Sequence, residues 1–393
     1  MKNELSAHRQ EARRERTYVA VTARRWPSKT KWAAGKRGRN EWQDVVAYDA
    51  DDLEHWLEQA PAVALAFAEE LGLSGPGVTS LAAYFSAWSS QSKPGISPEA
   101  LLTERTAQKE RILQKCMEWD SASTSSAIPI KGDSVEEAVA FTAATLLENQ
   151  VLTQRTVVVT DKAGWQFVAK NPNILFAIAA RPECADAPPD RAGLLVIIPY
   201  ATGDMKRQFK GTAGRIDDDD IVLDRISHHE FDQALKELGV EENDARRLSG
   251  LCGRSWSVFR RQHATNPAIR SPAWLDHPNA SVLSLLCLVG SWSSAKDADR
   301  DALSQIAGRS YESIERDLLS LEQLDDSPII HIGTVWKAKS PLELMALFAG
   351  RISEPELDRF CEQVGRILSK PDPIADLPSE ERTMAGFRGV EIQ

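Results

Sequence analysis

The residues best placed for chemistry lie in a short turn at positions 130–134 (IKGDS), between an apolar run and a helical one. At such a junction, backbone N–H groups, a lysine and a hydroxyl can hold nucleotide phosphates and Mg²⁺. Here the loop is shorter than GxxxxGK[ST], its first glycine is missing, and Asp133 brings negative charge toward a phosphate. ATP and Mg²⁺ are therefore disfavoured, and no cofactor is expected. The candidate nucleotide-binding residues are Lys131, Gly132, Ser134 and Asp161.

A purely structural interpretation of this turn is favoured. Ser134 and Glu137 fit a capping box, in which the two residues satisfy the first N–H groups of a helix. Asp161 follows the apolar run RTVVVT, where a working NTPase places a Mg²⁺-orienting carboxylate, but an N-cap is the simpler role. No catalytic residue is predicted.

The second candidate site is a basic segment with three tryptophans, TARRWPSKTKWAAGKRGRNEW. Residues 1–40 contain 12 Lys or Arg and 3 Asp or Glu, although the whole chain has a net charge of -10. Phosphate contact and a solvated basic face remain equal alternatives, while Trp26, Trp32 and Trp42 are expected to pack rather than stack on bases. The candidate DNA-binding residues are Arg24, Arg25, Lys29, Lys31, Lys36, Arg37 and Arg39.

No metal site is predicted. His228 and His229 precede Glu230, but adjacent side chains point apart and spacing supplies no third ligand. The five cysteines are far apart, without CxxC spacing, and are expected to be buried reduced thiols. They are Cys116, Cys184, Cys252, Cys287 and Cys361.

Length and composition indicate several domains. With 393 residues the chain exceeds what one core usually supports. No apolar run approaches the roughly 18 residues needed to cross a bilayer, and the first residues are polar. We therefore expect a cytoplasmic protein without a membrane partner.

The expected elements begin with a β-α-β-α unit. TYVAVT (17–22) and QDVVAY (43–48) are predicted strands around a short helix, and Asp49 is a predicted N-cap for the next helix. Pro61 ends that helix and a second helical stretch follows. The Gly-, Ser- and Pro-rich stretch from 74 to 98 is predicted to be a linker or meandering connection.

Apolar runs then alternate with helices, which predicts a mostly parallel sheet covered on both faces. A helix is expected near 103–118 and another at 134–147. The expected strands are 127–130, 155–160, 174–180, 193–200 and 220–226.

The remainder is predicted to be mainly helical. Gly239 closes one helix, and SWSVFRRQHA forms another with Arg260 and Arg261 exposed beside Phe259. Residues 300–338 give two helices, a tight turn at 308–310 and a hairpin, which is a winged-helix pattern. Its second helix, 311–324, is mostly acidic and would be repelled by DNA, so packing between domains is its expected role.

The chain resembles bacterial antiphage defence proteins that join an Mrr-like restriction-endonuclease domain to a STAND-type NTPase-like region. The similarity covers nearly the whole chain. Its matching stretches are TYVAVTARRWPSKTKWAAGKR, WQDVVAYDADDLEHWLEQAPAV, SVEEAVAFTAATLL, RSWSVFRRQ, DRDALSQIAGRSYESIERDLL and SPIIHIGTVWK.

The resemblance implies a nuclease that uses an Asp and a Glu-x-Lys to bind Mg²⁺. In the family these residues precede the strand at Thr17, and Glu4 is the only counterpart here. Family members also continue into a helical sensor region, so the chain is expected to be shortened at both ends.

The resemblance and the pattern together predict a multidomain α/β plus α architecture. The expected parts are an incomplete restriction-endonuclease-like domain (1–73), a linker (74–99), a degenerate P-loop NTPase-like α/β domain with a parallel sheet (100–227), a helical lid (228–270), a winged-helix-like domain (271–348) and a helical C-terminal segment (349–393).

Three hypotheses for function follow. The leading one is a non-catalytic regulatory or scaffold module whose partners are other domains or subunits of a defence complex. The second is part of a Mg-dependent DNA endonuclease whose catalytic residues lie outside this chain. The third is a DNA-binding regulator that uses the basic segment.

Overall fold

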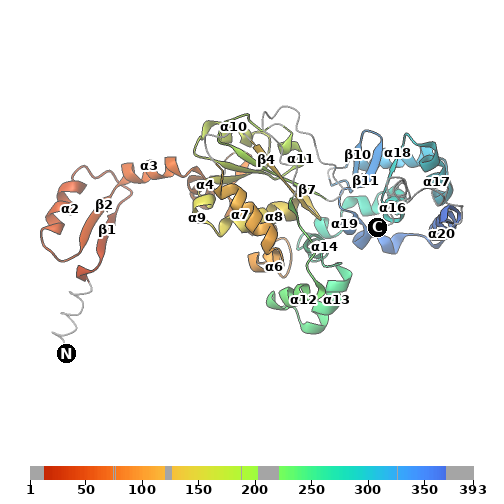
Figure 1. The fold of residues 1–393 in the computed structure, drawn as a ribbon, viewed down its shortest axis with the longest axis horizontal. Helices are drawn as coiled ribbons and strands as arrows, with labels where there is room; N and C mark the ends of the chain where they lie inside the picture. The colour runs from red at the N-terminus through yellow and green to blue at the C-terminus, as the bar shows by residue number, and fades with distance from the viewer. Residues whose placement is uncertain are drawn as a thin grey trace, which may run out of the picture.

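Figure 1 shows the fold of the chain in a computed structural model. It describes residues 13–73, 75, 77–119, 126–186, 188–201, 221–324 and 326–368. Glu4 and residues 369–393 lie outside these ranges. Among the described residues, no helix combines the length and the apolar character needed to cross a bilayer.

The N-terminal unit is a small β-α-β arrangement, as predicted. Strand β1 (Thr17–Val21) pairs in parallel with β2 (Asp44–Tyr48), and α2 (Lys29–Arg37) connects them. Helix α3 (Ala50–Gln59) follows, and Asp49 and Asp52 form a capping box at its start. Figure 1 shows this unit set apart from the rest of the chain and joined to it through α3.

A six-stranded sheet forms the centre of the molecule, with strand order β3-β5-β6-β7-β4-β8. All neighbours are parallel except β3 and β5, which confirms the predicted mostly parallel sheet. The strands are β3 (Val78–Thr79), β4 (Ser126–Gly132), β5 (Thr156–Val159), β6 (Phe176–Ala179), β7 (Leu195–Ala201) and β8 (Ile221–Val222).

The segment predicted as a linker, 74–99, is instead part of this central unit. It contains β3, which pairs with β5, and α5 (Leu81–Ser89), whose Phe85 and Trp88 are buried. Among its described residues, Gly77, Ser80 and Ser97 lie in the connections between these elements, so its composition resembles that of a linker.

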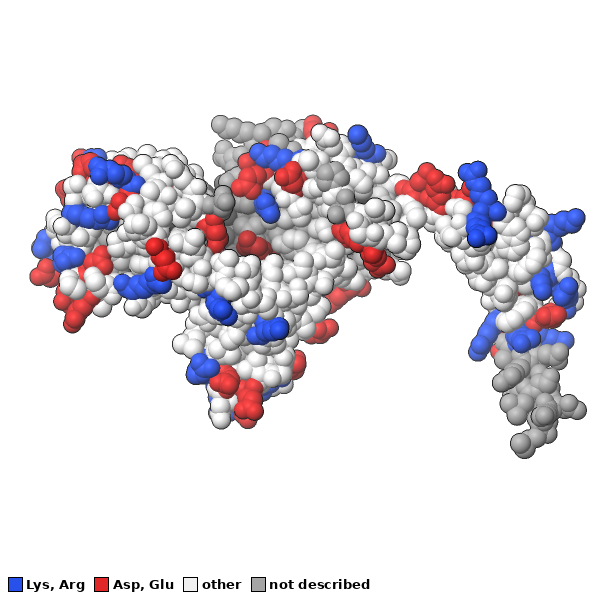
Figure 2. Space-filling model, turned by 180° about the vertical axis from the view of Figure 1, so that it is seen from behind, with Lys and Arg blue, Asp and Glu red and all other residues white. Residues whose placement is uncertain are grey.

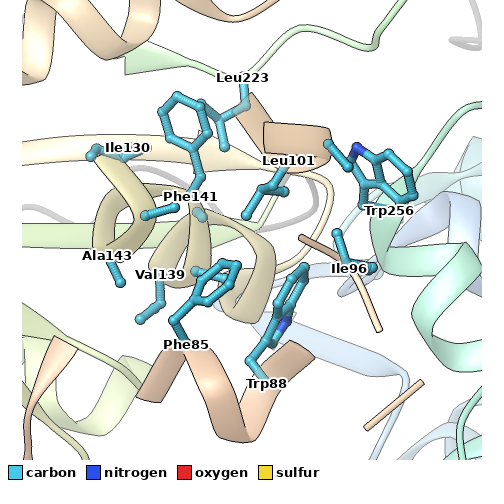
Figure 3. Close-up of a cluster of buried hydrophobic side chains, with 14 of the residues drawn as sticks. Phe85, Trp88, Ile96, Leu101, Ile130, Val139, Phe141, Ala143, Leu223 and Trp256 are labelled. Carbon is cyan, nitrogen blue, oxygen red and sulfur yellow. The ribbon is translucent and has the colours of Figure 1, made fainter. Parts of the chain in front are cut away.

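Helices cover both faces of the sheet because its strands alternate between two apolar cores. On β6, Phe176 and Ile178 enter one core while Ala177 and Ala179 enter the other. The first core also includes α8 (Val135–Leu147), in which every residue from Glu137 to Leu146 is buried (Figure 3). The other helices around the sheet are α4 (Pro61–Glu70), α6 (Pro98–Leu102), α7 (Thr106–Met117), α9 (Gln150–Thr153), α10 (Gly164–Lys170) and α11 (Pro182–Ala185).

The segment predicted as a helical lid contributes to the same core. Phe231 and Trp256 are fully buried there, with ring centroids 4.4 Å apart. The helices of this segment are α12 (His228–Glu237), α13 (Glu242–Leu251), α14 (Trp256–Gln262) and α15 (Pro267–Arg270).

The C-terminal unit, residues 273–368, has its own core. The predicted two-helix turn is present, with Gly308 in the left-handed region between α17 (Asp297–Ala307) and α18 (Tyr311–Glu322). The predicted hairpin is β10 (Ile329–Ile332) and β11 (Val335–Ala338), and β9 (Ser291–Ser293) adds a third strand. The remaining elements are η1 (Ala273–Asp276), η2 (Ala280–Val282), α16 (Leu283–Val289), α19 (Pro341–Phe348), η3 (Ala349–Arg351) and α20 (Glu354–Leu368).

Candidate functional site

The carboxyl-terminal edge of the central sheet is the natural place for a ligand. In open parallel sheets, ligands bind beyond this edge, where the strand order reverses. Here the chain passes from β4 to β5, returns through β6 to β7 beside β4, and then adds β8 on the other side of β4. The turn after β4 therefore lies at the reversal point, and this turn is the 130–134 segment.

The structure places the predicted residues of this turn on different elements. Lys131 belongs to β4 and precedes Gly132, whereas a phosphate-binding lysine follows its second glycine. Gly132 packs closely, because a Cβ atom added there would lie 3.1 Å from the carbonyl oxygen of Ser134. No nucleotide-sized loop separates the strand from α8.

Ser134 caps α8 as predicted, but the expected capping box is incomplete. Its hydroxyl accepts a hydrogen bond from the backbone N–H of Glu137 at 3.2 Å. The Glu137 side chain does not return to Ser134. Instead it contacts Arg105 and Ser257, so the capping-box prediction is wrong in its second half.

Glu137 is the centre of a buried polar network. It accepts a hydrogen bond from Arg105 Nη2 at 2.7 Å, and both side chains are almost completely inaccessible. The backbone N–H of Ser257 donates to the other carboxylate oxygen at 3.2 Å, and the Ser257 hydroxyl donates to the same oxygen. Since that hydroxyl has one proton, Ser134 must donate in the 2.7 Å contact between the two serines.

This network uses the groups that a nucleotide would need. In a phosphate-binding loop the hydroxyl of the Ser134 position is a Mg²⁺ ligand. Here it is fully engaged with α14 through Ser257 and with the first turn of α8. The arginine that reaches the turn, Arg105, is held by Glu137 and by the carbonyl oxygen of Asp224 at 3.1 Å.

The charge at the turn is also wrong for a phosphate. Burial and, next in size, the neighbouring Glu137 carboxylate raise the pKa of Asp133, whose side chain is 13% exposed. Arg225 lies 3.8 Å away and opposes this shift. Asp133 before the N-cap and Glu137 in the first turn of α8 place carboxyl groups where a phosphate site needs cations, so the residues present do not fit a triphosphate.

Asp161 does not cap a helix directly. Its Oδ1 accepts a hydrogen bond from the backbone N–H of Ala163 at 2.8 Å, ahead of α10, whose N-cap residue is Ala163 itself. Asp161 therefore stabilises the turn before the helix and is exposed. The N-cap prediction is off by two residues.

A cleft of about 660 Å³ opens beyond the same sheet edge. The C-terminal unit forms its other wall through β10 and the start of α19. Its volume is in the range of small-molecule sites. Acidic side chains outnumber basic ones in the lining: Glu136, Glu183, Glu322, Asp326 and Glu343 against Arg181, Arg261 and Lys339.

Arg260 and Arg261 are not exposed, contrary to the prediction. Arg260 is buried and donates to Gln91. Arg261 reaches the C-terminal unit, where its Nε lies 3.2 Å from Glu343 and its Nη1 lies 3.3 Å from Asp326. The adjacent arginines in the sequence resembled a solvated pair because their partners are far away along the chain.

The basic N-terminal segment has fewer free cations than its sequence suggests. Asp51, Asp49 and Asp44 form ion pairs with three of the seven predicted DNA-binding residues, Arg25, Lys29 and Arg37 respectively. Lys36 lies over the Trp32 ring. The side chains of Arg24, Lys31 and Arg39 have no carboxylate partner among the described residues. Figure 2 shows both signs of charge around this unit and acidic residues on the adjoining α3.

The tryptophans of this segment pack against one another, as expected. Trp26 and Trp32 have ring centroids 4.9 Å apart, and Tyr18 lies between Trp32 and Trp42. They form the small core between α2 and the strands.

The remaining candidates were the histidine pair and the cysteines. His228, the first residue of α12, contacts Ser249 in α13. Within the described ranges, no group of three or more His, Cys, Asp or Glu residues could hold a metal ion. All five cysteines are free thiols. Cys361 is exposed and Cys287 is half-buried, so the expectation that all five are buried is wrong.

Neither a protein-family model nor a curated protein matches the sequence. The candidate site must therefore be interpreted from its own geometry. Its central residues, Arg105 and Ser257, were missed by sequence reasoning because neither belongs to a motif and each meets Glu137 only in the folded chain.

Proposed function

We propose that this chain is a non-catalytic regulatory or scaffold module of a bacterial antiphage defence protein of the STAND type. In this proposal the central sheet is a degenerate P-loop-like core, residues 228–270 are its helical lid and the C-terminal unit is a winged helix. The N-terminal unit is the incomplete restriction-endonuclease-like domain. The assignment to defence proteins rests on the resemblance of the sequence.

One observation carries the non-catalytic part of the proposal. The turn at the reversal point of the sheet is occupied by the protein's own polar network of Arg105, Glu137, Ser134 and Ser257. The network joins α7, α8 and α14, so it holds together the helices that would otherwise surround a nucleotide. A core held together in this way fits a scaffold role better than a catalytic one.

A turnover assay tests this proposal. The full chain is incubated with Mg-ATP, and in a second reaction with duplex DNA and Mg²⁺. We expect neither phosphate release nor strand cleavage above the protein-free blank, and no change in Lys131→Ala. Hydrolysis that Lys131→Ala abolishes, while the surface variant Lys109→Ala retains it, would contradict the proposal.

A further inference from the structure

Within the described residues, the sheet of the N-terminal unit has two strands, whereas parallel sheets normally have more strands and helices on both faces. Helix α2 covers one face, where Tyr18 packs with Trp32 and Trp42. In Figure 1 no described element is drawn against the other side of β1. Among the described residues, β1 therefore has both a free edge and a bare face.

Hydrogen bonding shows which backbone groups of β1 are free. Gln43 donates to the carbonyl of Arg16, and Thr22 donates to the carbonyl of Tyr48. Because alternate residues of a parallel strand bond to the same neighbour, even-numbered residues face β2. The N–H and C=O groups of Thr17, Val19 and Val21 consequently point away from β2.

The side chains of the same odd-numbered residues form the bare face. Val19 and Val21 are 51% and 59% exposed, although both are strong strand formers that usually pack. The register places Tyr48 beside Val21, and Tyr48 packs edge-on against Trp56, itself 45% exposed. A row of unpaired backbone groups next to an apolar face is what an added strand needs.

The charges at the two ends of β1 indicate what kind of strand would bind to its free edge. Arg14 and Arg16 precede the strand and Arg24 follows it, and none has a carboxylate partner among the described residues. Pairing two copies of β1 in an antiparallel sense would bring Arg14 and Arg16 of one copy beside Arg24 of the other. Like charges would also align in a parallel pair. An incoming strand with acidic ends would gain attraction at both places.

We propose that the free edge of β1 binds an extended segment of a partner protein, in which apolar side chains alternate and both ends carry Asp or Glu. The partner strand would bond to Thr17, Val19 and Val21, and its apolar side chains would lie beside Val19 and Val21 and extend the bare face. If the chain is a regulatory module, as proposed above, this edge is where it would bind its partner protein. The inference rests on the proposed function in that respect alone. Its test measures peptide binding and not catalysis, so the two proposals can fail independently.

The experiment measures binding of a labelled peptide, Glu-Asp-Val-Thr-Val-Thr-Val-Asp-Glu, to the full chain by fluorescence anisotropy. The comparison peptide replaces each acidic residue with lysine. We expect the acidic peptide to bind about tenfold more tightly at low salt, since two or three exposed ion pairs contribute roughly 0.2–1 kcal/mol each. Added salt should reduce the difference.

Two variants of one residue test the backbone contact. Val19→Pro removes an N–H that points away from β2 and leaves the bonds to β2 in place, so it should abolish binding. Val19→Thr keeps the N–H and the strand preference, so it should retain binding. Circular dichroism of both variants checks that the N-terminal unit remains folded.

A charge reversal keeps the test decisive if Val19→Pro disturbs the fold. The double variant Arg16→Glu, Arg24→Glu should prefer the lysine-ended peptide over the acidic one. Equal binding of both peptides to the native chain, or undiminished binding by folded Val19→Pro, would overturn the proposal. So would sedimentation showing a dimer that Val19→Pro dissociates, or duplex DNA displacing the peptide at lower concentration.

Discussion

Glu137 and Arg105 are each almost fully buried and hold one another in the centre of the molecule. Removing one member of such a pair leaves a buried charge without a partner, which costs about 3–5 kcal/mol. Ser257 would also lose the carboxylate that accepts its hydroxyl and its backbone N–H.

We therefore expect Glu137→Ala to lower the free energy of unfolding by about 3–5 kcal/mol in urea denaturation. The matched control is Lys109→Ala, which removes the ion pair with Glu148 on the surface. That change should cost at most about 1 kcal/mol. Similar losses in the two variants would show that the buried network contributes little to stability.

At the scale of residues, sequence reasoning found the local contacts and missed the distant ones. Ser134 was predicted as an N-cap because its partner lies three positions away. Glu137 was assigned to the same cap, but its partners Arg105 and Ser257 lie 32 and 120 positions away. Nothing in a single sequence indicates contacts over such separations.

Two elements of the central unit meet through a pair of glycines. A Cβ atom added to Gly164 at the start of α10 would lie 2.1 Å from the carbonyl oxygen of Gly77, which precedes β3. The same carbonyl accepts a hydrogen bond from Thr160, so it cannot move freely. The close approach of α10 and β3 thus requires glycine at position 164.

Gly164→Ala should destabilise the chain by roughly 1–3 kcal/mol, as overpacking of a tight contact does. Gly250→Ala in α13 is the control because a Cβ atom added there would meet no atom within 4 Å. In that helix, alanine should raise stability by about 0.5–1 kcal/mol. Thermal denaturation should therefore show a lower melting temperature for Gly164→Ala and a higher one for Gly250→Ala. A higher melting temperature for Gly164→Ala would contradict the close contact.

Among the elements, strands and helices with a strong periodic pattern were predicted close to their observed bounds. The run RTVVVT predicted a strand at 155–160, and β5 spans Thr156–Val159. The error was the supposed linker at 74–99, where β3 is only two residues long and α5 follows a stretch rich in glycine. So short a strand is identified by its pairing with β5, which the sequence does not display.

The central and C-terminal units meet at an ion pair with an unusual carboxyl group. Burial raises the pKa of Glu343 to about 7, although Arg261 opposes the shift. Glu136, Arg260 and Asp326 also act on it, in opposing directions. Because the folded pKa exceeds the ordinary value of 4.5, the folded state prefers the protonated carboxyl.

The contribution of Glu343 to stability is therefore complete below pH 4.5 and is lost as pH rises through about 7. We expect Glu343→Gln to flatten the decline of the melting temperature over this range. Glu322→Gln, in the same cleft, should retain the native profile. An unchanged profile in Glu343→Gln would show that this carboxyl does not titrate there.

At the scale of the whole molecule, the order of the units along the chain could be predicted, but the contacts between them could not. The helix-turn-helix and hairpin pattern indicated the C-terminal unit, while Arg261 was expected to be exposed and instead reaches Glu343. The cleft between the units likewise depends on segments that are distant in sequence.

The central claim is that the turn after β4 holds the protein's own side chains rather than a triphosphate. Calorimetric titration of Mg-ATP into the full chain tests it most directly. The account predicts no saturable binding tighter than about 1 mM, in the native chain or in Lys131→Ala. Binding with a dissociation constant of about 1 μM would contradict it, if Lys131→Ala weakens that binding and Lys109→Ala leaves it unchanged.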